Sequence, residues 1–590
     1  MKKVLPSKNM NEEKLKGNRH TLAHLLAASV IELYPGAQNA IGPSIDNGFY
    51  QDFEIPVKIS DEDLPKIEAK MREILKTWHT SEKREVTLEE AKKQFSWNIY
   101  KSQLIEEFAV GGKTLTFYTL GNFVDLCKGG HSEDPAKDVL PDSFKLSHVA
   151  GAYWKGDEKN KMLTRIYGLA FESKATLDAY ILQQEQAKLR DHRKLGKELE
   201  LFTVIDEIGA GLPLFYPKGA ILRRTIEGYI QEIQERRGFV PIWIPHITKG
   251  KLYEISGHLD KYDAMYSPMV IDDENYYLKP MNCPHFMMLY KSIQHSYRDL
   301  PVRYTCTTTN YRYEKSGELS GLTRVRALTQ DDCHVFCEAD KIKAEIQVML
   351  DMIGELYDVF GFKDFYVRIS LRDPKNKQKY LGTDEVWETA ENALREIVKQ
   401  TGWKYEEAED EAAFYGPKLD FMFSDAIGRE WQLSTIQLDF NLPQRFELEY
   451  TNNEGTKSRP VVIHRAMLGS VERFMGIMIE HFAGAFPVWL SPIQVSIVPV
   501  KETQHEYAQK IYDALIAKNV RVELNLENDS LGKRINGAKA KKVPYVIVIG
   551  DKEKGANVIT VETRSEKLQG ITLEDFVSRV EKEIKERTLN

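Results

Sequence analysis

The sequence contains few cysteines and no long apolar run. Its five cysteines in 590 residues are unevenly spaced, which excludes a disulfide framework of the kind that stabilises small secreted domains. No stretch of about 18 uncharged apolar residues occurs, so no membrane-spanning helix is expected. The opening MKKVLPSKNMNEEKLKG has basic residues with no apolar run behind them and does not match a secretory signal. We therefore expect a cytoplasmic protein.

Two nucleotide-binding fingerprints are also absent. Neither a P-loop nor a G-x-G-x-x-G sequence occurs, so a nucleotide would need another kind of site. The chain has no large excess of positive charge, and its formal net charge is -7. Nucleic-acid binding depends on local positive surface, so this value neither favours nor excludes an RNA partner.

The length of the chain predicts several domains, because 590 residues exceed what one hydrophobic core supports. We expect an α+β multidomain protein. Residues 1–175 mix helices with short strands and form a first domain, and residues 176–200 read as a charged linker helix. Residues 201–489 begin with a helix over 219–236 and predict an antiparallel sheet backed by helices. Residues 490–590 alternate strands and helices, which is typical of a small α/β domain with a largely parallel sheet.

Charged residues gather in the run NYRYEKSGELSGLTRVRALTQDDCHVF, which spans residues 310–336. Arg312 and Glu314 alternate along a predicted strand and so share one face. After a glycine-containing loop, Arg324 and further polar residues return on a second strand. An arginine suits a phosphate because its planar fork donates two parallel hydrogen bonds. An ordinary solvated strand face fits the same pattern, so both interpretations stand at this point.

Two groups of histidine and cysteine residues are candidate metal ligands. In the first half of the chain, His20 and His24 share one helix face, and Cys127-x-x-x-His131 follows. Both a closed zinc site and packed histidines fit this group. The second group consists of Cys283, His334 and His464. These three lie so far apart that no local spacing rule pairs them, and spacing alone does not predict a shared metal.

Three motifs in order resemble those of the class II aminoacyl-tRNA synthetases. The helix ending in RRGFVPIWIP resembles motif 1, the run at 310–336 resembles motif 2, and HRAMLGSVERF at 464–474 resembles motif 3. Within that class the chain resembles the threonyl-tRNA synthetases over essentially its whole length. The resemblance implies a ligase that activates threonine with ATP and transfers it to tRNA(Thr). It also implies a homodimer, because motif 1 forms the dimer interface of the class.

The resemblance assigns roles to the motif residues. Arg312 is expected to bind the α-phosphate of ATP, Glu314 the adenine edge and Arg473 the γ-phosphate. Arg324 is a further phosphate contact, and Mg²⁺ is expected with the ATP. Pocket positions around the amino acid match Gln330, Asp332, Tyr415, Gln432 and Gln437. Of all these residues, the expected catalytic set is Arg312, Arg473, Gln330 and Asp332.

The resemblance also changes the interpretation of the two histidine and cysteine groups. Cys283, His334 and His464 coincide with the zinc ligands of the family, and three protein ligands leave an open position for threonine. A site that engages the hydroxyl group rejects valine. Serine keeps the hydroxyl and lacks one methyl group, which is worth only ~1–3 kcal/mol, so a second hydrolytic site is needed. The residues that match this editing site, which is expected to act without a metal, are His20, His24, Lys101, Asp125, Cys127 and His131.

The last domain carries the expected anticodon contacts. These are Lys533, Arg534, Lys541 and Lys542 in LGKRINGAKAKKVPY, together with Glu553 in GDKE. A solvated lysine face fits the same helix. Glu562 stands where the family often has an anticodon-reading arginine, and Arg564 follows two positions later. Met1 lies only nineteen positions before His20, so we expect the N-terminal ubiquitin-like domain of bacterial members to be missing.

Two other functions were weighed against the active ligase. One is a non-catalytic regulator that binds structured RNA with an inherited synthetase fold. The other is a relative that charges another amino acid, such as alanine or proline. Loss of motif arginines or zinc ligands would favour the regulator, and none of these residues is lost. The intact set of Cys283, His334 and His464 argues against another amino acid, because the resemblance ties that zinc to the hydroxyl group of threonine. The sequence therefore predicts an active, editing ligase.

Overall fold

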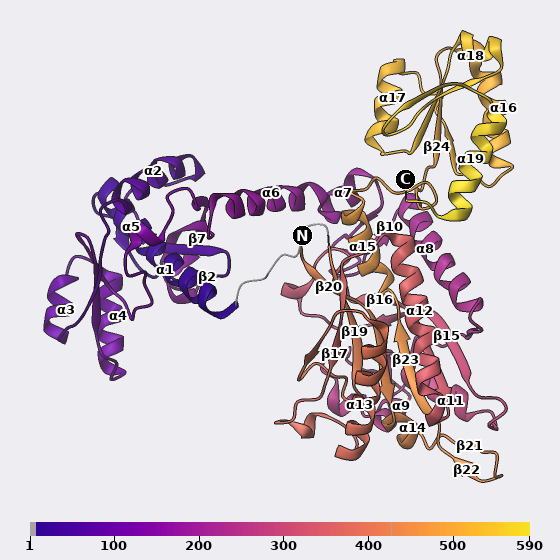
Figure 1. Cartoon of the computed structure of the whole chain (residues 1–590), viewed down its shortest axis with the longest axis horizontal. Helices are drawn as coiled ribbons and strands as arrows, with labels where there is room; N and C mark the ends of the chain where they lie inside the picture. The colour runs from indigo at the N-terminus through magenta and orange to yellow at the C-terminus, as the bar shows by residue number, and fades with distance from the viewer. Residues whose placement is uncertain (1–7, 426–427, 590) are drawn as a thin grey trace. The chain divides into compact units, whose positions relative to one another are not determined.

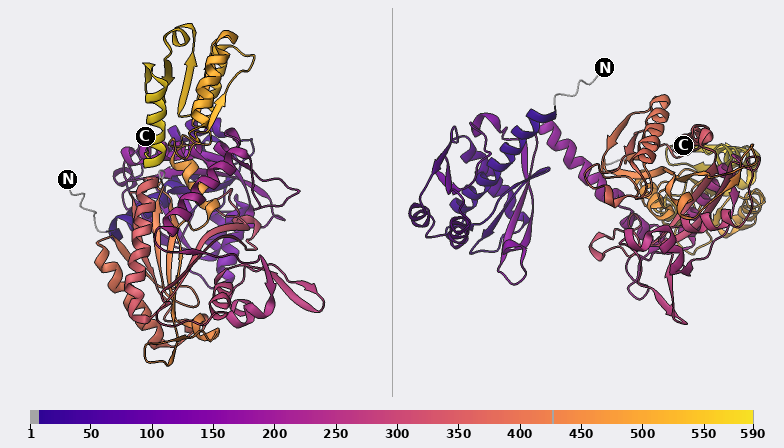
Figure 2. Two further views of the ribbon diagram at one scale, coloured as in Figure 1. Left: turned by 90° about the vertical axis from the view of Figure 1, so that its right-hand side faces the viewer. Right: turned by 90° about the horizontal axis from the view of Figure 1, so that it is seen from below.

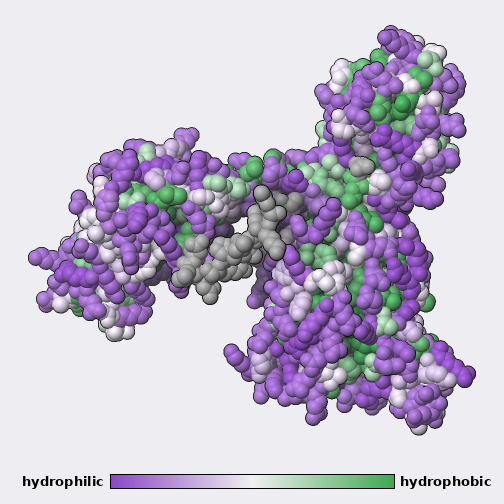
Figure 3. All heavy atoms as spheres, viewed as in Figure 1, coloured by the Kyte–Doolittle hydropathy of each residue, from purple (hydrophilic) through white to green (hydrophobic). Residues whose placement is uncertain are grey.

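The computed structural model describes residues 8–425 and 428–589. The chain divides into an N-terminal unit that ends at Glu185 and a C-terminal unit that begins at Gln186, and each is described by itself (Figure 1). On the face drawn in Figure 3, hydrophilic residues cover most of the surface of both units. Within the described ranges, no helix is both long and apolar enough to cross a membrane.

The N-terminal unit is built on the helix predicted from its histidine-rich start. Helix α1 (Lys8–Leu33) buries Leu22, Leu26 and Val30 against Phe49 and other core residues of an antiparallel sheet. That sheet has the order β1-β3-β8-β7, and β2 also pairs with β3. The strands are β1 (Gln38–Asn39), β2 (Ser44–Ile45), β3 (Gly48–Glu54), β7 (Phe144–Tyr153) and β8 (Met162–Ala170).

A second, smaller sheet of the N-terminal unit holds residues of the candidate editing site. Its order is β4-β5-β6, and it carries its own apolar cluster with helices α3 and α4. The elements are β4 (Ser81–Glu85), α3 (Leu88–Gln94), α4 (Ile99–Val110), β5 (Thr116–Leu120) and β6 (Phe123–Leu126). Lys101 lies on α4 and Asp125 on β6, whereas His20 and His24 lie on α1. The packing of these elements brings the predicted editing residues together.

The charged segment predicted as one linker helix is two helices. Helix α6 (Lys174–Arg190) ends just before Asp191, and α7 (His192–Glu198) begins directly after it. The Asp191 carboxylate accepts a hydrogen bond from the backbone N–H of Arg193 at 2.8 Å, so Asp191 caps the second helix. The break is therefore a local capping event that charge content alone does not reveal.

An eight-stranded sheet forms the centre of the C-terminal unit, with the order β11-β15-β16-β23-β20-β19-β17-β18. The predicted antiparallel pairing is confirmed for all neighbours except the two edge pairs, which are parallel. The strands are β11 (Val240–Pro241), β15 (Val302–Tyr311), β16 (Ala327–Cys337), β17 (Phe365–Ser370), β18 (Tyr405–Ala408), β19 (Lys418–Ser424), β20 (Glu430–Asp439) and β23 (Val461–Ala466).

Helices cover this sheet and complete the largest core of the chain. Helix α8 (Pro217–Glu235) confirms the prediction of a helix over 219–236 and buries Leu222, Ile226 and Ile230. Helix α12 (Ile342–Phe360) lies along the sheet (Figures 1 and 2) and buries ten of its residues. Helix α15 (Val471–His481) joins the same core. This core holds the central strands rigidly, which fixes the side chains at their ends.

The final part of the C-terminal unit has a five-stranded sheet of order β25-β24-β26-β27-β28. Its first three strands are parallel, as predicted from their alternation with helices. The last two continue the sheet antiparallel; the short helix α18 (Asp551–Ala556) stands between β26 and β27, and β27 leads directly to β28. The strands are β24 (Val495–Pro499), β25 (Val522–Leu524), β26 (Tyr545–Ile549), β27 (Ile559–Glu562) and β28 (Lys567–Ile571).

Candidate functional sites

A cavity of about 310 Å³ in the C-terminal unit brings together most of the predicted nucleotide and amino-acid contacts. Strands β16, β20 and β23 supply its walls, and the start of α15 closes one side. The predicted residues that line it are Arg312, Glu314, Arg324, Gln330, Gln432, Gln437 and Arg473. Most strands of the sheet lie between Arg324 and Arg473 along the chain. Only the folded arrangement of these strands therefore brings the two residues to one cavity.

Arg312, Glu314 and Arg324 of the motif 2 run lie beside the strands and not within them. Strand β15 ends at Tyr311, before Arg312 and Glu314, and β16 begins at Ala327, after Arg324. The prediction that Arg312 and Glu314 alternate along one strand and that Arg324 lies on a second is therefore wrong, whereas the polar residues that follow at 330–332 do lie on β16. The backbone N–H of Glu314 donates to the Arg312 carbonyl at 2.9 Å, and this tight turn ends the ladder. The side chains consequently project from a loop into the cavity.

Three guanidinium groups are concentrated at this cavity. Ser470 caps α15 and accepts a hydrogen bond from the backbone N–H of Arg473 at 3.1 Å. The Arg473 side chain donates from Nε to the Thr323 carbonyl at 3.1 Å. Burial, followed by the positive charges of Arg312 and Arg324, lowers the pKa of Arg473. Like charges held together without enough compensating carboxylates favour an anionic ligand.

Cys283, His334 and His464 are buried and meet on one side of the sheet. Cys283 begins α11 (Cys283–Lys291), His334 lies on β16 and His464 on β23, where it pairs directly with His334. One potential ligand atom from each lies within 4.8 Å of the other two. Both ring nitrogens of His334 and Nδ1 of His464 are buried without a hydrogen-bond partner. One thiol, two imidazoles and unpartnered nitrogens form a donor set that suits zinc.

The predicted amino-acid contacts surround this group. The Asp332 carboxylate accepts from Asn282 Nδ2 at 2.9 Å. The Tyr415 hydroxyl donates to the Gln437 side chain, and the Tyr415 ring stacks on His464 with centroids 5.0 Å apart. Gln330 donates to the Gly469 carbonyl at 3.2 Å. These groups therefore form the wall between the three possible metal ligands and the cavity of the motif residues.

Two buried groups of this site, Asp439 and Lys279, were not predicted from the sequence. Asp439 Oδ2 lies 2.9 Å from His464 Nε2, and this contact leaves Nδ1 for a ligand. Asp439 is two positions after Gln437 on one strand, so strand alternation already places both on one face. Lys279 is completely buried, and its ammonium donates to Asn282 and Thr308 at 3.0 and 2.8 Å. No spacing pattern in the sequence indicates that lysine.

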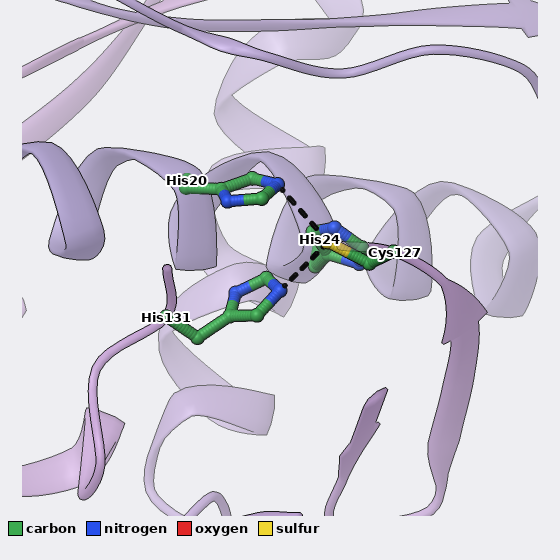
Figure 4. A group of neighbouring side chains, drawn as sticks. All are labelled: His20, His24, Cys127 and His131. Carbon is green, nitrogen blue, oxygen red and sulfur yellow. Dashed lines mark hydrogen bonds between the residues drawn. The ribbon is translucent and has the colours of Figure 1, made fainter. Parts of the chain in front are cut away.

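The N-terminal unit holds a second cluster, shown in Figure 4. His20 and His24 project from α1, Cys127 follows β6, and His131 lies in the loop after it. The Cys127 sulfur lies 3.5 Å from His20 Nε2 and 3.2 Å from His131 Nε2. One atom from each of the four residues could bind a common metal ion. A cavity of about 810 Å³ opens beside this cluster and is lined by His20 and His131.

A buried ion network lies behind the four residues. Asp125 is held by Lys101 at 2.6 Å and lies 3.2 Å from His24 Nδ1. Burial opposes the charged forms here, yet Asp125 and Cys127 raise the pKa of His24 to about 9. The neighbouring imidazoles outweigh burial and lower the pKa of the Cys127 thiol to about 3. Burial lowers the pKa of His131 to about 4, so this ring is neutral at pH 7.

The predicted anticodon contacts have different environments. Lys533 and Lys541 are exposed and pair with Asp529 and Glu523 at 2.8 and 2.9 Å. Arg534 is buried and donates to the Asn525 carbonyl at 3.2 Å, and Lys542 donates to the Ala483 carbonyl at 2.5 Å. Glu553 accepts from the Gly550 N–H and from Thr560. The exposed lysines are thus better placed for a solvent-borne partner than Arg534.

Comparison with known proteins agrees with this geometry. The family model for the tRNA synthetase class II core domain (G, H, P, S and T) matches residues 268–482, and that for the anticodon binding domain matches residues 494–583. The fold and the arginine-lined cavity therefore define a class II aminoacyl-tRNA synthetase.

Similar proteins of known name identify the family within this class. A threonine–tRNA ligase of Rubrobacter xylanophilus is 48% identical over 96% of this chain and 89% of its own length. One from Cytophaga hutchinsonii is 46% identical over 96% of this chain and 88% of its own length. The chain belongs to the threonine–tRNA ligase family.

A solved structure is similar to part of the chain. It is that of the RNA binding domain of threonyl-tRNA synthetase from Cryptosporidium parvum Iowa II, 34% identical with a TM-score of 0.63. The match covers 68% of this chain and 99% of that chain. The family assignment therefore rests on both sequence and fold.

Proposed function

We propose that the chain forms threonyl-adenylate at the cavity lined by Arg312 and Arg473, and that threonine is selected at Cys283, His334 and His464. The observation that carries the proposal is the convergence of three guanidinium groups and three buried metal-type donors on adjacent parts of one sheet. Family membership supports ATP, threonine and tRNA(Thr) as the substrates.

The charged residues of the cavity would act by binding and orientation. Arg312 is assigned to the α-phosphate and Arg473 to the γ-phosphate, with Mg²⁺ on the phosphate oxygens. Negative charge shifts between these positions as the adenylate forms, so preorganised cations stabilise the transition state. Arg324 pairs with Glu314 at 2.8 Å and with Glu318 at 3.0 Å, so it would have to leave these carboxylates to contact a phosphate, and Glu314 is assigned to adenine.

The metal-type donors would provide amino-acid selectivity. Cys283, His334 and His464 would hold a zinc ion that supplies a Lewis-acid position for the amino and hydroxyl groups of threonine. Asp332 and the Tyr415–Gln437 pair would orient the amino acid beside them. A site that uses the hydroxyl rejects valine by ~10⁴–10⁵-fold, whereas serine differs by only one methyl group.

The cluster of the N-terminal unit would correct the serine error. His20 and His131 line a cavity of about 810 Å³ that would receive the end of an aminoacylated tRNA, and His24 and Cys127 belong to the same cluster. The neutral His131 ring can accept a proton from a water that attacks the ester carbonyl. The Lys101–Asp125 pair would hold the His24 ring in place through the contact of Asp125 with His24. We assign this cluster to metal-free hydrolysis of seryl-tRNA(Thr).

Further parts of the proposal follow the domain plan predicted from the sequence. Residues 1–175 would form the editing domain, 176–200 the linker, 201–489 the catalytic domain and 490–590 the anticodon-binding domain. Two copies would associate through the segment around Trp243, which is 79% exposed beside edge strand β11. We also propose that the protein is cytoplasmic.

ATP–pyrophosphate exchange with threonine, serine and valine tests the catalytic assignment. Wild type should respond to threonine, less to serine and almost not to valine, and Cys283→Ala should lose the threonine response. Cys337→Ala is the matched control, because Cys337 is also buried but lies outside the three-residue group. Exchange that survives in Cys283→Ala would refute the zinc assignment, and no exchange in wild type would refute the adenylation function.

A further inference from the structure

His192 joins three separate segments of the catalytic machinery. It is the first residue of α7 and only 3% exposed. Its Nδ1 lies 2.6 Å from Glu480 Oε1 on α15. Its Nε2 lies 3.0 Å from the backbone nitrogen of Leu322, whose N–H donates to it. One neutral imidazole therefore connects the linker, the motif 3 helix and the motif 2 loop.

Two glycines create the space for this ring. A Cβ atom at Gly321 would lie 2.1 Å from His192 Nε2, and the residue has a φ of +48°. A Cβ atom at Gly476 on α15 would lie 3.2 Å from the Thr323 side chain and 3.6 Å from the His192 ring. The loop, the ring and the helix are thus packed at the closest approach that side chains allow.

The packed loop leads directly to the nucleotide cavity. Thr323 follows Leu322, and its carbonyl accepts a hydrogen bond from Arg473 Nε at 3.1 Å. Thr323 and Arg473 both line the cavity. A shift of the Leu322 backbone would therefore move the acceptor that orients the Arg473 guanidinium.

Burial keeps the ring neutral, and both of its nitrogens are engaged within the protein. Burial, together with the cations of Arg193 and Arg429, outweighs Asp191 and lowers the pKa of His192 to about 4. Asp191, His192 and Glu480 lie close enough to form a possible metal-binding group. However, Asp191 caps α7 and pairs with Arg193, and Glu480 pairs with Arg429. Both nitrogens of His192 are already engaged, so a hydrogen-bond relay describes the group.

We propose that His192 is a positioning residue for ATP, which holds the Leu322–Thr323 segment so that Thr323 orients Arg473. The proposal rests on the assignment of Arg473 to the ATP phosphates. It predicts an effect on ATP that is separate from any effect on threonine, because none of these contacts involves Cys283, His334 or His464.

Two substitutions separate the two hydrogen bonds of the ring. His192→Asn keeps a donor near the Nδ1 position but cannot reach the Leu322 N–H. His192→Gln places a carbonyl oxygen near the Nε2 position and can accept from it. We expect His192→Asn to raise the KM for ATP about tenfold in pyrophosphate exchange, as for a buried amide left without its partner. The KM for threonine should stay unchanged, and His192→Gln should restore the KM for ATP to within about threefold of wild type.

Matched controls distinguish positioning from general stability. His295 is 7% exposed and bonds the Tyr290 carbonyl at 3.1 Å, so His295→Asn removes a buried histidine away from the cavity. It should lower the melting temperature without changing the KM for ATP. Equal KM values for ATP in His192→Asn and wild type, or equal increases for ATP and threonine, would overturn the proposal. Equal increases in the Asn and Gln variants would overturn it too. If wild type itself shows no exchange, the adenylation function fails first.

Discussion

At the scale of single residues, the partner of each ring nitrogen gives the buried histidines different chemistry. Nε2 of His464 is next to Asp439 and Nδ1 is unpartnered, which suits a metal ligand. Both nitrogens of His192 are hydrogen-bonded, which suits a rigid connector. His24 lies between Asp125 and Cys127, and its pKa is raised to about 9, which suits a charged group. Identical side chains thus acquire separate functions from their neighbours.

If Cys283, His334 and His464 hold zinc as proposed, Asp439→Asn should weaken its binding without removing a ligand. The carboxylate fixes the ring and tautomer of His464 across 2.9 Å, and loss of such a partner costs about 10–100-fold in metal affinity. Competition with a chromogenic chelator measures the zinc dissociation constant of wild type and variant. An unchanged constant would show that Asp439 does not orient a metal ligand.

The His24 contact should make the stability of the N-terminal unit depend on pH. Its folded pKa of about 9 exceeds the ordinary value of 6.5. The contribution of His24 to the free energy of unfolding is therefore complete below pH 6.5 and is lost as the pH rises through 9. Its largest possible value is about 3 kcal/mol. His24→Gln should destabilise this unit strongly at pH 6 and weakly at pH 10. Hydrogen exchange in peptides of residues 12–185, corrected for intrinsic exchange rates, measures the stability of this unit at each pH. Equal destabilisation by His24→Gln at both pH values would contradict the prediction.

At the scale of elements, short breaks in secondary structure position the functional groups. The turn after β15 releases Arg312 and Glu314 into the cavity. The break between α6 and α7 places His192 at a helix start, where its side chain reaches α15. The N-terminus of α15 places Arg473 three residues after its cap. Each break ends or begins a regular element at a residue whose side chain contacts the cavity or another element.

Ser470→Ala should destabilise the C-terminal unit by about 1 kcal/mol. The serine hydroxyl accepts the Arg473 N–H at the start of α15, and alanine leaves that donor without its capping partner. Ser470→Thr retains a hydroxyl and serves as the control. Urea unfolding followed by fluorescence measures the change. If alanine and threonine variants were equally stable, the cap would not contribute.

At the scale of the whole molecule, two units carry two chemistries. The C-terminal unit contains the nucleotide cavity and the metal-type donors, and the N-terminal unit contains the histidine and cysteine cluster. The two candidate sites share no residue. Mutations in either site are therefore expected to affect activation and editing independently.

Trp243→Glu should weaken self-association. Trp243 is 79% exposed and Val240 is 55% exposed along the edge of the eight-stranded sheet, and a carboxylate in a closed apolar interface is costly. Sedimentation velocity should show a dimer for wild type and a shift towards monomer for the variant. Trp97→Glu, at a 48% exposed tryptophan of the N-terminal unit, should leave the dimer intact. A monomeric wild type would refute the dimer.

The sequence by itself determined several of the helices, the antiparallel character of the central sheet and the chemical types of the site residues. Helical spacing predicted α1 and α8, β-rich runs between helices predicted the sheet, and the resemblance of three motifs to those of a known class predicted the arginine-lined cavity. These features are local or depend on motif spacing along the chain. Tertiary structure alone decided that Cys283, His334 and His464 meet, since their separation of up to 181 positions follows no spacing rule. It also decided the partners of His192 and Asp439, because a side-chain hydrogen bond requires two elements to be packed together within about 3 Å.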